Sequence, residues 1–540
     1  MKNRTIAAVF LITAFGATGL SAQQADRSSR GENGNQAPAF DVLAGAVDAI
    51  ARMHMDEFND SLLWEAAIDG LIASLDDPYA ELFTPEEADE WEEATTGNYS
   101  GIGLQITLLN EEVTVTGVFR GFPASEMGIL VGDVIVGVDG HDASDWSTGM
   151  TADSIRGPAG SAVNVDVRRA GYTDPFSFDI TRAEVHVPAV SSGVIEGGIG
   201  YVAMDRVARN AAREMNEALQ EMQGHRGLII DLRRNPGGFL DESLMLADLF
   251  LEPGSTLAST VQRAPGGSAA EADTDSFTDR WPQMVPNLPI VILVDQYTAS
   301  GAEILAGALQ DYDRALVLGE RTFGKGVVQT VMPLPHGRRL RFTTGSWMTP
   351  LGRSLQRDRD NEMRPIEEDV DTLRRVTTPG GRTLVDGGGI FPDMALKEDT
   401  LTTNEQEFLR ATFEAEFPLA QRIVEHGFEI AAERLASDGG PELADGEFEA
   451  FTERLVTEGL DPALIEDQEI LDYLKWRVRV AVAQRMDDIG AEAAVRLERD
   501  PVLAEAVRLL TTSTTQAELF LEADKVRADS TTTRGESSSK

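Results

Sequence analysis

One stretch, residues 289–333, constrains the fold of this chain more than any other. Its continuous apolar run, Ile290–Val294, predicts a buried strand. Ser300 follows a short polar break and opens a helical pattern. A second apolar run then leads to Lys325, which lies between two glycines, 25 residues beyond the serine. The pattern therefore predicts a serine at a strand-to-helix turn and a lysine on the next loop of an α/β core.

Ser300 has two interpretations. With Glu303 it has the spacing of a capping box, in which serine and glutamate satisfy each other's free backbone N–H groups at the start of a helix. The second interpretation is a nucleophile, because its small neighbours, Ala299 and Gly301, leave room for the backbone of a substrate. The nearby lysine, Lys325, favours the second interpretation.

Lys325 is unusual for its residue type. Between residues 3 and 396 every other basic side chain is an arginine. Arginine cannot lose its proton in a protein, whereas a desolvated lysine can. A neutral amine beside a hydroxyl is a workable general base, which gives a chemical reason for lysine at this position.

Composition and missing motifs exclude several classes of function. The 540 residues include 47 basic and 90 acidic side chains, and a net charge of −43 argues against nucleic acid as a partner. The absence of cysteine excludes a disulfide, a thiol nucleophile and a cysteine metal site. Residues 319–326 nearly match a phosphate-binding loop, but Gly326 replaces the hydroxyl residue and a strand pattern follows, so we reject nucleotide binding. We expect no cofactor and no metal.

The N-terminus has the pattern of a secretory signal peptide. Lys2 and Arg4 precede an apolar stretch at residues 6–17, and small residues follow before Gln23. This predicts a periplasmic or otherwise extracytoplasmic protein. An uncleaved membrane anchor, which would keep the protein near a membrane, is disfavoured because the apolar core is short for a span.

Periodicity and composition divide the rest of the chain. The predicted regions are a signal peptide at 1–22, a linker at 23–39, an N-terminal helical segment at 40–96, a glycine- and strand-rich module at 97–183, an α/β core at 184–399, a helical region at 400–527 and a disordered Ser/Thr-rich tail at 528–540. We interpret the helical region as a solvated appendage that packs on the core or on a second subunit.

The module at residues 97–183 resembles a PDZ domain. It begins with the loop Ser100, Gly101, Ile102 and Gly103, which runs into a strand. In such a domain successive backbone amides capture the terminal carboxylate of a peptide, while the peptide adds a strand to the sheet. The alternative is a small β-module that only spaces the neighbouring domains.

Two glycines, Gly237 and Gly238, follow a predicted buried strand at residues 227–232. A Gly-Gly pair after a strand is commonly just a turn. Alternatively, its N–H groups point at a developing negative charge, where only glycine lets the backbone approach closely.

The chain from about residue 40 to residue 396 resembles the carboxy-terminal processing peptidases, the tail-specific serine peptidases with a Ser–Lys dyad. The motifs that carry the resemblance occur in the family's order. They are L-D-D-P-Y at 75–79, the PDZ-like module, D-L-R-R-N-P-G-G at 231–238, T-A-S-G-A-E at 298–303 and T-F-G-K-G at 322–326. The resemblance implies a multidomain α/β fold, with a ClpP/crotonase-like core and a PDZ domain inserted ahead of it. Residues 356–385 are longer than the family requires, and the C-terminal helical region does not match it.

The resemblance also implies the roles of individual residues. Ser300 would be the nucleophile, Lys325 the base, and Gln329 the residue that orients the amine. The oxyanion hole would use the N–H of Gly301 and the N–H of either Gly237 or Gly238; the resemblance does not distinguish these two glycines.

These expectations favour an exported serine endopeptidase that recognises the C-terminal tails of protein substrates. A homo-oligomer is compatible with the sequence. The alternative is a catalytically silent PDZ adaptor on a peptidase scaffold, which an intact set of Ser300, Lys325 and Gln329 disfavours. A Ser-His-Asp hydrolase, a zinc peptidase and a penicillin-binding enzyme are rejected. G-x-S-x-G and H-E-x-x-H are absent, and S-x-x-K occurs only at residues 537–540.

Overall fold

The computed structural model describes residues 37–537 with the exception of Arg120, residues 264–271, Asn361, residues 399–400, Asp438 and Asp487. The predicted signal peptide at residues 1–22 and the start of the predicted linker lie outside the described residues. Among the described helices, none combines the length and the apolar character that a membrane span requires.

The core is a six-stranded sheet in which β15 occupies a central position. The order is β10-β11-β12-β15-β16-β21, and only β10 runs antiparallel to its neighbour. The strands are β10 (Val190–Ile195), β11 (Ile199–Met204), β12 (Gly227–Asp231), β15 (Ile290–Val294), β16 (Leu316–Gly319) and β21 (Met394–Ala395). Parallel strands place their carboxyl ends at one edge, so the loops that follow β12, β15 and β16 come together there.

Helices cover both faces of this sheet, which explains the continuous apolar runs in its strands. Leu228 and Ile230 face one layer of helices, whereas Ile229 between them faces the other. The first layer contains α6 (Ala211–Glu221), α7 (Leu240–Asp248) and α8 (Gly301–Asp311), and the second contains α13 (Ile489–Arg496), α14 (Pro501–Thr512) and α15 (Gln516–Ser537). The predicted α/β core is confirmed.

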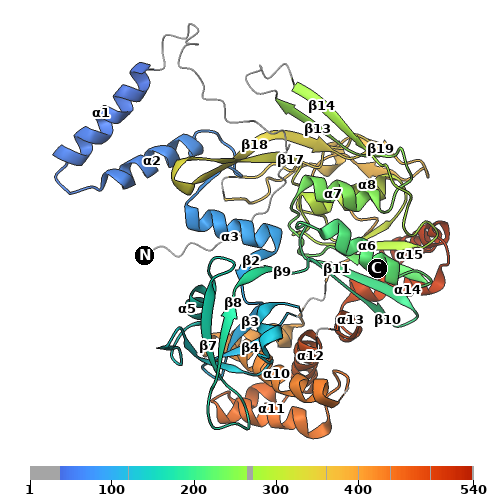
Figure 1. Ribbon diagram of the computed structural model, residues 1–540. Helices are drawn as coiled ribbons and strands as arrows, with labels where there is room; N and C mark the ends of the chain where they lie inside the picture. Colours follow the sequence, from blue (N-terminus) through green and yellow to red (C-terminus); the bar gives the residue numbers. More distant parts are fainter. Residues whose placement is uncertain are drawn as a thin grey trace.

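A second, antiparallel sheet lies above the core (Figure 1). Its strands are β1 (Glu81–Phe83), β13 (Thr256–Arg263), β14 (Ala272–Thr278), β17 (Val327–Pro333) and β18 (Arg339–Met348). The β17–β18 hairpin follows directly after the loop that carries Lys325. A small hairpin from the long segment at 356–385 forms β19 (Arg375–Thr377) and β20 (Thr383–Val385). Single-turn helices are η1 (Pro335–Gly337), η2 (Val370–Thr372) and η3 (Pro462–Ile465).

The PDZ-like module has its own apolar core. It contains β3 (Leu104–Leu109), β4 (Glu112–Val118), α4 (Pro123–Met127), β5 (Val134–Val138), β6 (His141–Asp142), α5 (Thr148–Ile155), β7 (Ala162–Arg168) and β8 (Phe176–Thr181). A separate two-stranded ribbon of β2 (Asn98–Gly101) and β9 (Ala183–His186) connects the module to its neighbours.

The C-terminal helical region is divided between two places, and its last part packs on the core, as one form of its interpretation expected, although it is buried there and not solvated. The first four helices form a cluster with its own core beside the PDZ-like module (Figure 1). They are α9 (Thr403–Glu414), α10 (Leu419–Ser437), α11 (Asp445–Thr457) and α12 (Gln468–Arg485). The last three helices are a structural layer of the core sheet. The helix α15 continues to Ser537, through residues whose composition predicted disorder.

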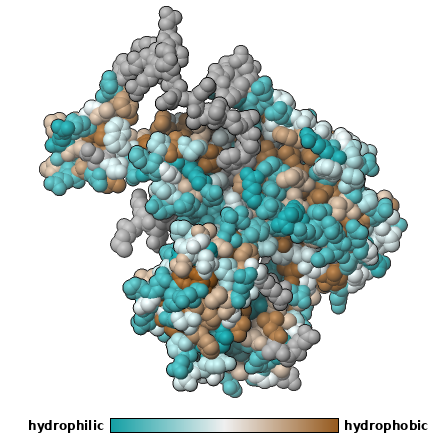
Figure 2. Space-filling model, in the orientation of Figure 1, coloured by the Kyte–Doolittle hydropathy of each residue, from teal (hydrophilic) through white to brown (hydrophobic). Residues whose placement is uncertain are grey.

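Three helices precede the PDZ-like module. They are α1 (Ala37–Met53), α2 (Asp60–Ala73) and α3 (Pro85–Thr96). The first two form a hairpin that projects from the body of the molecule (Figure 1), and large apolar side chains such as Phe40 and Leu62 are exposed on it. Figure 2 shows apolar surface among polar surface over α1 and α2.

Candidate active site

Ser300 occupies the turn between β15 and α8 and is buried in the chain. Its backbone has φ 56° and ψ −117°, a conformation that is rare and strained for a residue with a side chain. Among the described residues its Oγ has no hydrogen-bond partner. A buried hydroxyl without a partner is costly for folding alone, so this site calls for an explanation beyond stability.

Only the glutamate half of the expected capping box is engaged. The N–H of Ser300 donates to Oε2 of Glu303 at 2.8 Å, whereas the serine hydroxyl falls short of a hydrogen bond. The hydroxyl is therefore not used as a helix cap, and it remains available to another group.

Glu303 does more than cap a helix. Its buried carboxylate also accepts hydrogen bonds from the hydroxyl of Thr322 at 2.5 Å, from the N–H of Gly324 at 2.9 Å and from the N–H of Lys325 at 2.9 Å. Burial raises the pKa of Glu303, and these hydrogen bonds oppose the rise. Since Ser300 and Lys325 donate to the same oxygen, Oε2, this carboxylate fixes the serine turn against the lysine loop.

Lys325 is only 1% exposed, so its amine is largely removed from water. Its Nζ donates to Oε1 of Gln329 at 2.7 Å and lies 4.9 Å from the centre of the Tyr79 ring. Burial lowers the pKa of the Lys325 amine well below its usual range, and the charge of Arg341 lowers it further. These conditions favour the neutral amine that a general base needs.

Gln329 is oriented by the N-terminal motif at residues 75–79. Its Nε2 donates to the backbone carbonyl of Tyr79 at 3.0 Å, which turns its amide oxygen toward Lys325. The loop is fixed in turn because Asp77 accepts the N–H of Thr343 at 2.9 Å. The motif at residues 75–79 therefore holds the side chain of Gln329 in place, a role that the spacing of its residues did not predict.

The structure separates the two glycines that the sequence left equivalent. The N–H of Gly237 donates to Oδ1 of Asn235 at 2.8 Å and is engaged. In the described residues no acceptor is recorded for the N–H of Gly238 or of Gly301. A Cβ at Gly237, where φ is 89°, would lie 2.5 Å from the nitrogen of Gly301 and 2.8 Å from Cβ of Ser300. Glycine at position 237 therefore lets the loop approach the serine, and Gly238 is the one with a donor to offer.

The long segment at residues 356–385 begins by supporting the lysine loop. Oε1 of Gln356 accepts the N–H of Gly326 at 2.9 Å, and the N–H of Arg357 donates to the carbonyl of Gly324 at 2.9 Å. The sequence showed only its extra length. These contacts show that the first residues of the segment pack against the loop that carries Lys325.

The PDZ-like module contains a groove of about 470 Å³ beside β3 and α5, with apolar walls that include Leu104, Phe119 and Ile155. Ser100 and Gly101 lie on β2 and pair with β9, and the Ser100 hydroxyl donates to the carbonyl of Gly157 at 2.7 Å. Ile102 and Gly103 of the predicted loop have backbone N–H groups for which the described residues provide no acceptor.

Two family patterns match the chain. Peptidase family S41 matches residues 198–372, which include the serine turn and the lysine loop, and the PDZ domain matches residues 100–180. In the described part of the chain, no cluster of three or more His, Asp and Glu side chains could hold a metal ion.

Curated relatives agree with these matches. The chain is 34% identical over 304 residues to the carboxy-terminal-processing protease of Bartonella bacilliformis, covering 55% of this chain and 68% of that protein. It is 34% identical over 321 residues to the carboxyl-terminal-processing protease of Synechocystis, covering 58% of this chain and 73% of that protein. A solved structure, the photosystem II D1 C-terminal processing protease, is 26% identical with a TM-score of 0.34, covering 66% of this chain and 92% of that one.

The family models that match and the identity and coverage of these relatives lead to one assignment. This chain belongs to peptidase family S41, and it is a carboxy-terminal-processing serine protease with a PDZ domain and a ClpP/crotonase-like core.

Proposed function

We propose that the protein is an exported endopeptidase that holds a substrate by its C-terminal tail and cleaves it with Ser300 and Lys325. The observation that carries the catalytic assignment is the Glu303 carboxylate. One of its oxygen atoms accepts the N–H of Ser300, whose hydroxyl is unpartnered among the described residues, and the N–H of the buried Lys325, so it holds the two loops together. Such an arrangement suits an activated nucleophile and its base.

The proposed reaction begins when the neutral amine of Lys325 takes the proton of the Ser300 hydroxyl. The serine oxygen attacks the carbonyl carbon of the scissile peptide bond, and the N–H groups of Gly238 and Gly301 stabilise the resulting oxyanion. Lys325 then returns the proton to the leaving amine as the C–N bond breaks. Water hydrolyses the acyl-enzyme by the same proton transfers in the second half of the reaction.

The catalytically silent adaptor is the weaker candidate. An adaptor has no use for a strained serine with an unpartnered hydroxyl, nor for a buried lysine whose loop is fixed by a buried glutamate. Both features destabilise a fold unless something else is gained from them.

The nucleophile is tested by Ser300→Ala. This variant removes one oxygen atom that has no hydrogen-bond partner among the described residues, so the fold and the melting temperature should be retained while peptide cleavage is lost. Release of fragments from a denatured model protein, followed by mass spectrometry, measures the effect. Cleavage at a rate near that of the wild type would refute the assignment.

The base is tested by Lys325→Arg and by the pH profile. Arginine keeps the charge but cannot be deprotonated, so kcat should fall by about 10²- to 10⁴-fold, the usual contribution of a general base. The neutral amine is the active form, and the pKa of Lys325 is lowered. In the wild type, kcat/KM should therefore increase as the pH rises through that lowered pKa and then level off. An active Lys325→Arg enzyme would mean that the base lies elsewhere.

Tail recognition is tested by amidating the C-terminus of a peptide substrate that ends in an apolar residue. We expect a loss of about 10- to 100-fold in kcat/KM, because the free N–H groups of the groove lose one or two charge-assisted hydrogen bonds. Added salt should modestly improve cleavage of the free acid, since it screens the net charge of −43.

A matched pair of variants locates this effect. Gly103→Ala would place a Cβ 2.6 Å from Cβ of Phe122 and should remove the preference for the free acid. Gly171→Ala has a similar positive φ but open space around it, and it should keep the preference. If the wild type cut the acid and the amide equally fast, the groove would not read the tail.

Export is proposed from the pattern at residues 1–22. Cleavage should follow the small residues near positions 19–22, and the mature protein should be periplasmic. Mass spectrometry of the N-terminus of the native protein locates the cleavage site. A chain that starts at Met1 and remains in the cytoplasm would contradict the proposal.

A further inference from the structure

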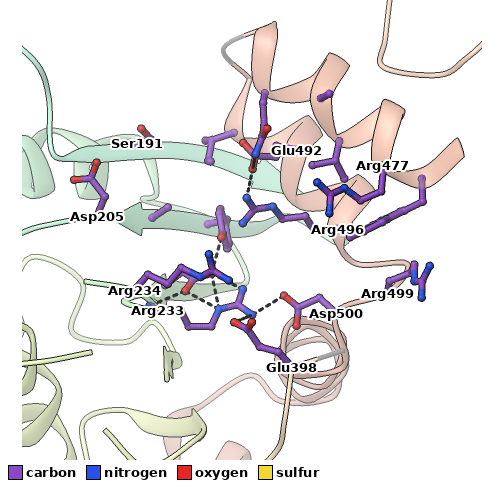
Figure 3. A pocket seen from close by; sticks show the side chains of 18 of the residues that line it. Ser191, Asp205, Arg233, Arg234, Glu398, Arg477, Glu492, Arg496, Arg499 and Asp500 are labelled. Carbon is purple, nitrogen blue, oxygen red and sulfur yellow. Dashed lines mark hydrogen bonds and ion pairs between the residues drawn. The ribbon is translucent and has the colours of Figure 1, made fainter. Parts of the chain in front are cut away.

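A cavity of about 760 Å³ lies at the carboxyl end of the core sheet (Figure 3), and neither Ser300 nor Lys325 is among its lining residues. One side is formed by β11 and the loop after β12, which includes Arg233 and Arg234. The other side is formed by α12, α13 and the residues that connect α13 to α14. The volume is in the range of pockets that hold a small organic molecule.

The cavity is rich in arginine in a chain that is strongly acidic. Its charged lining residues are Arg233, Arg234, Arg477, Arg496, Arg499, Asp205, Asp231, Glu398, Glu492 and Asp500. Arg233 forms ion pairs with Asp231 and Asp500 at 2.6 Å each, and Arg496 pairs with Glu492 at 2.5 Å.

Two of the arginines differ from the rest. In the part of the chain that the structure describes, no carboxylate forms an ion pair with the guanidinium of Arg234 or of Arg477. Arg477 donates to the hydroxyl of Tyr473 at 3.3 Å, and its guanidinium lies 5.9 Å from the centre of the Tyr473 ring. Figure 3 shows Arg477 and Arg496 extending from the helices toward the side on which Arg233 and Arg234 lie.

The uncharged walls are apolar and aromatic. Tyr473 and Trp476 on α12, together with Val480 and Ile489, line the cavity. Guanidinium groups recognise carboxylates and phosphates, and aromatic walls accept an apolar body. The five arginines and five carboxylates make the lining formally neutral, so a singly charged head group fits better than a multiply charged phosphate.

We propose that this cavity binds a small organic carboxylate with an apolar or aromatic body. Arg234 and Arg477 supply the charge that its head group requires, and the wall formed by Tyr473 and Trp476 accepts its body. Nothing in the proposed cleavage reaction uses this site.

The cavity is also connected to the oxyanion loop. The N–H of Arg234 donates to both carboxylate oxygens of Asp295 at 3.0 Å, and φ of Arg234 is 61°. The next residue, Asn235, holds the N–H of Gly237 and accepts the N–H of Ala299. A ligand that fixes Arg234 against α12 thus fixes the segment that presents Gly238.

We therefore infer that the bound carboxylate raises kcat, an inference that rests on the proposed function. The oxyanion N–H acts on the transition state, so KM should stay unchanged. We expect an increase of about fivefold, the lower end of typical coupling between two sites.

Binding is measured by calorimetry on the full-length Ser300→Ala protein, which separates it from turnover. The probe is 4-phenylbutyrate, and 4-phenylbutanamide and inorganic phosphate are its comparisons. We expect 4-phenylbutyrate to bind at least tenfold more tightly than either. Arg477→Gln should weaken its binding at least tenfold, whereas Lys475→Gln, which removes an exposed charge two residues away on the same helix, should leave it unchanged.

A further control excludes the tail-binding groove, because Gly103→Ala should not alter the binding of this probe. Equal affinity for the amide, tighter binding of phosphate, or retention of binding in Arg477→Gln would overturn the proposed site. The activity arm uses wild-type enzyme with saturating 4-phenylbutyrate. Binding without a change in kcat would overturn the coupling alone, and a wild type that cleaves nothing would overturn the proposed function while the calorimetry still tests the cavity.

Discussion

The active site depends on the buried carboxylate of Glu303. It accepts four hydrogen bonds from two successive loops of the core, the serine turn and the loop of Thr322, Gly324 and Lys325. Hydrogen bonds to a charged group contribute about 1.5 to 3 kcal/mol each, enough to offset the burial of the carboxylate and to hold Ser300 in a strained conformation. Without it, three backbone N–H groups would be left unsatisfied in the interior.

The same arrangement explains why a lysine held by a glutamine suits the role of the proposed base. Gln329 accepts the hydrogen bond from the amine but carries no negative charge, so it orients Nζ without stabilising the ammonium as a carboxylate would. Asp77 and Glu303, whose carboxylate is bound to the backbone of Lys325, raise the pKa of the amine less than burial and Arg341 lower it. Gln329 thus orients the amine of Lys325, whereas other groups determine its pKa.

Local patterns predicted much of this site. The apolar run before Ser300 and the isolated lysine can each be recognised within a short stretch of sequence, so periodicity and residue type were enough to predict them. Contacts between residues that are distant in sequence could not be predicted in this way. Gly237 and Gly238 are equivalent in sequence, and only the side chain of Asn235 distinguishes them. Likewise, amphipathic helices in the last third of the chain do not indicate whether they cover a sheet or form a separate cluster.

The PDZ domain and the ribbon at its base contact the rest of the molecule at several places, which links tail binding to the core. At its base, His186 of β9 lies between Asn98 and Glu214 of α6, at 2.7 and 2.6 Å. At its far side, the N–H of Asn110 donates to Glu425 of α10 at 3.0 Å. A rigid movement of the PDZ domain relative to Ser300 must therefore disturb at least one of these attachments. Since α12 belongs to the same cluster as α10, a movement that shifts α10 through Asn110 also acts on the wall of the arginine-lined cavity.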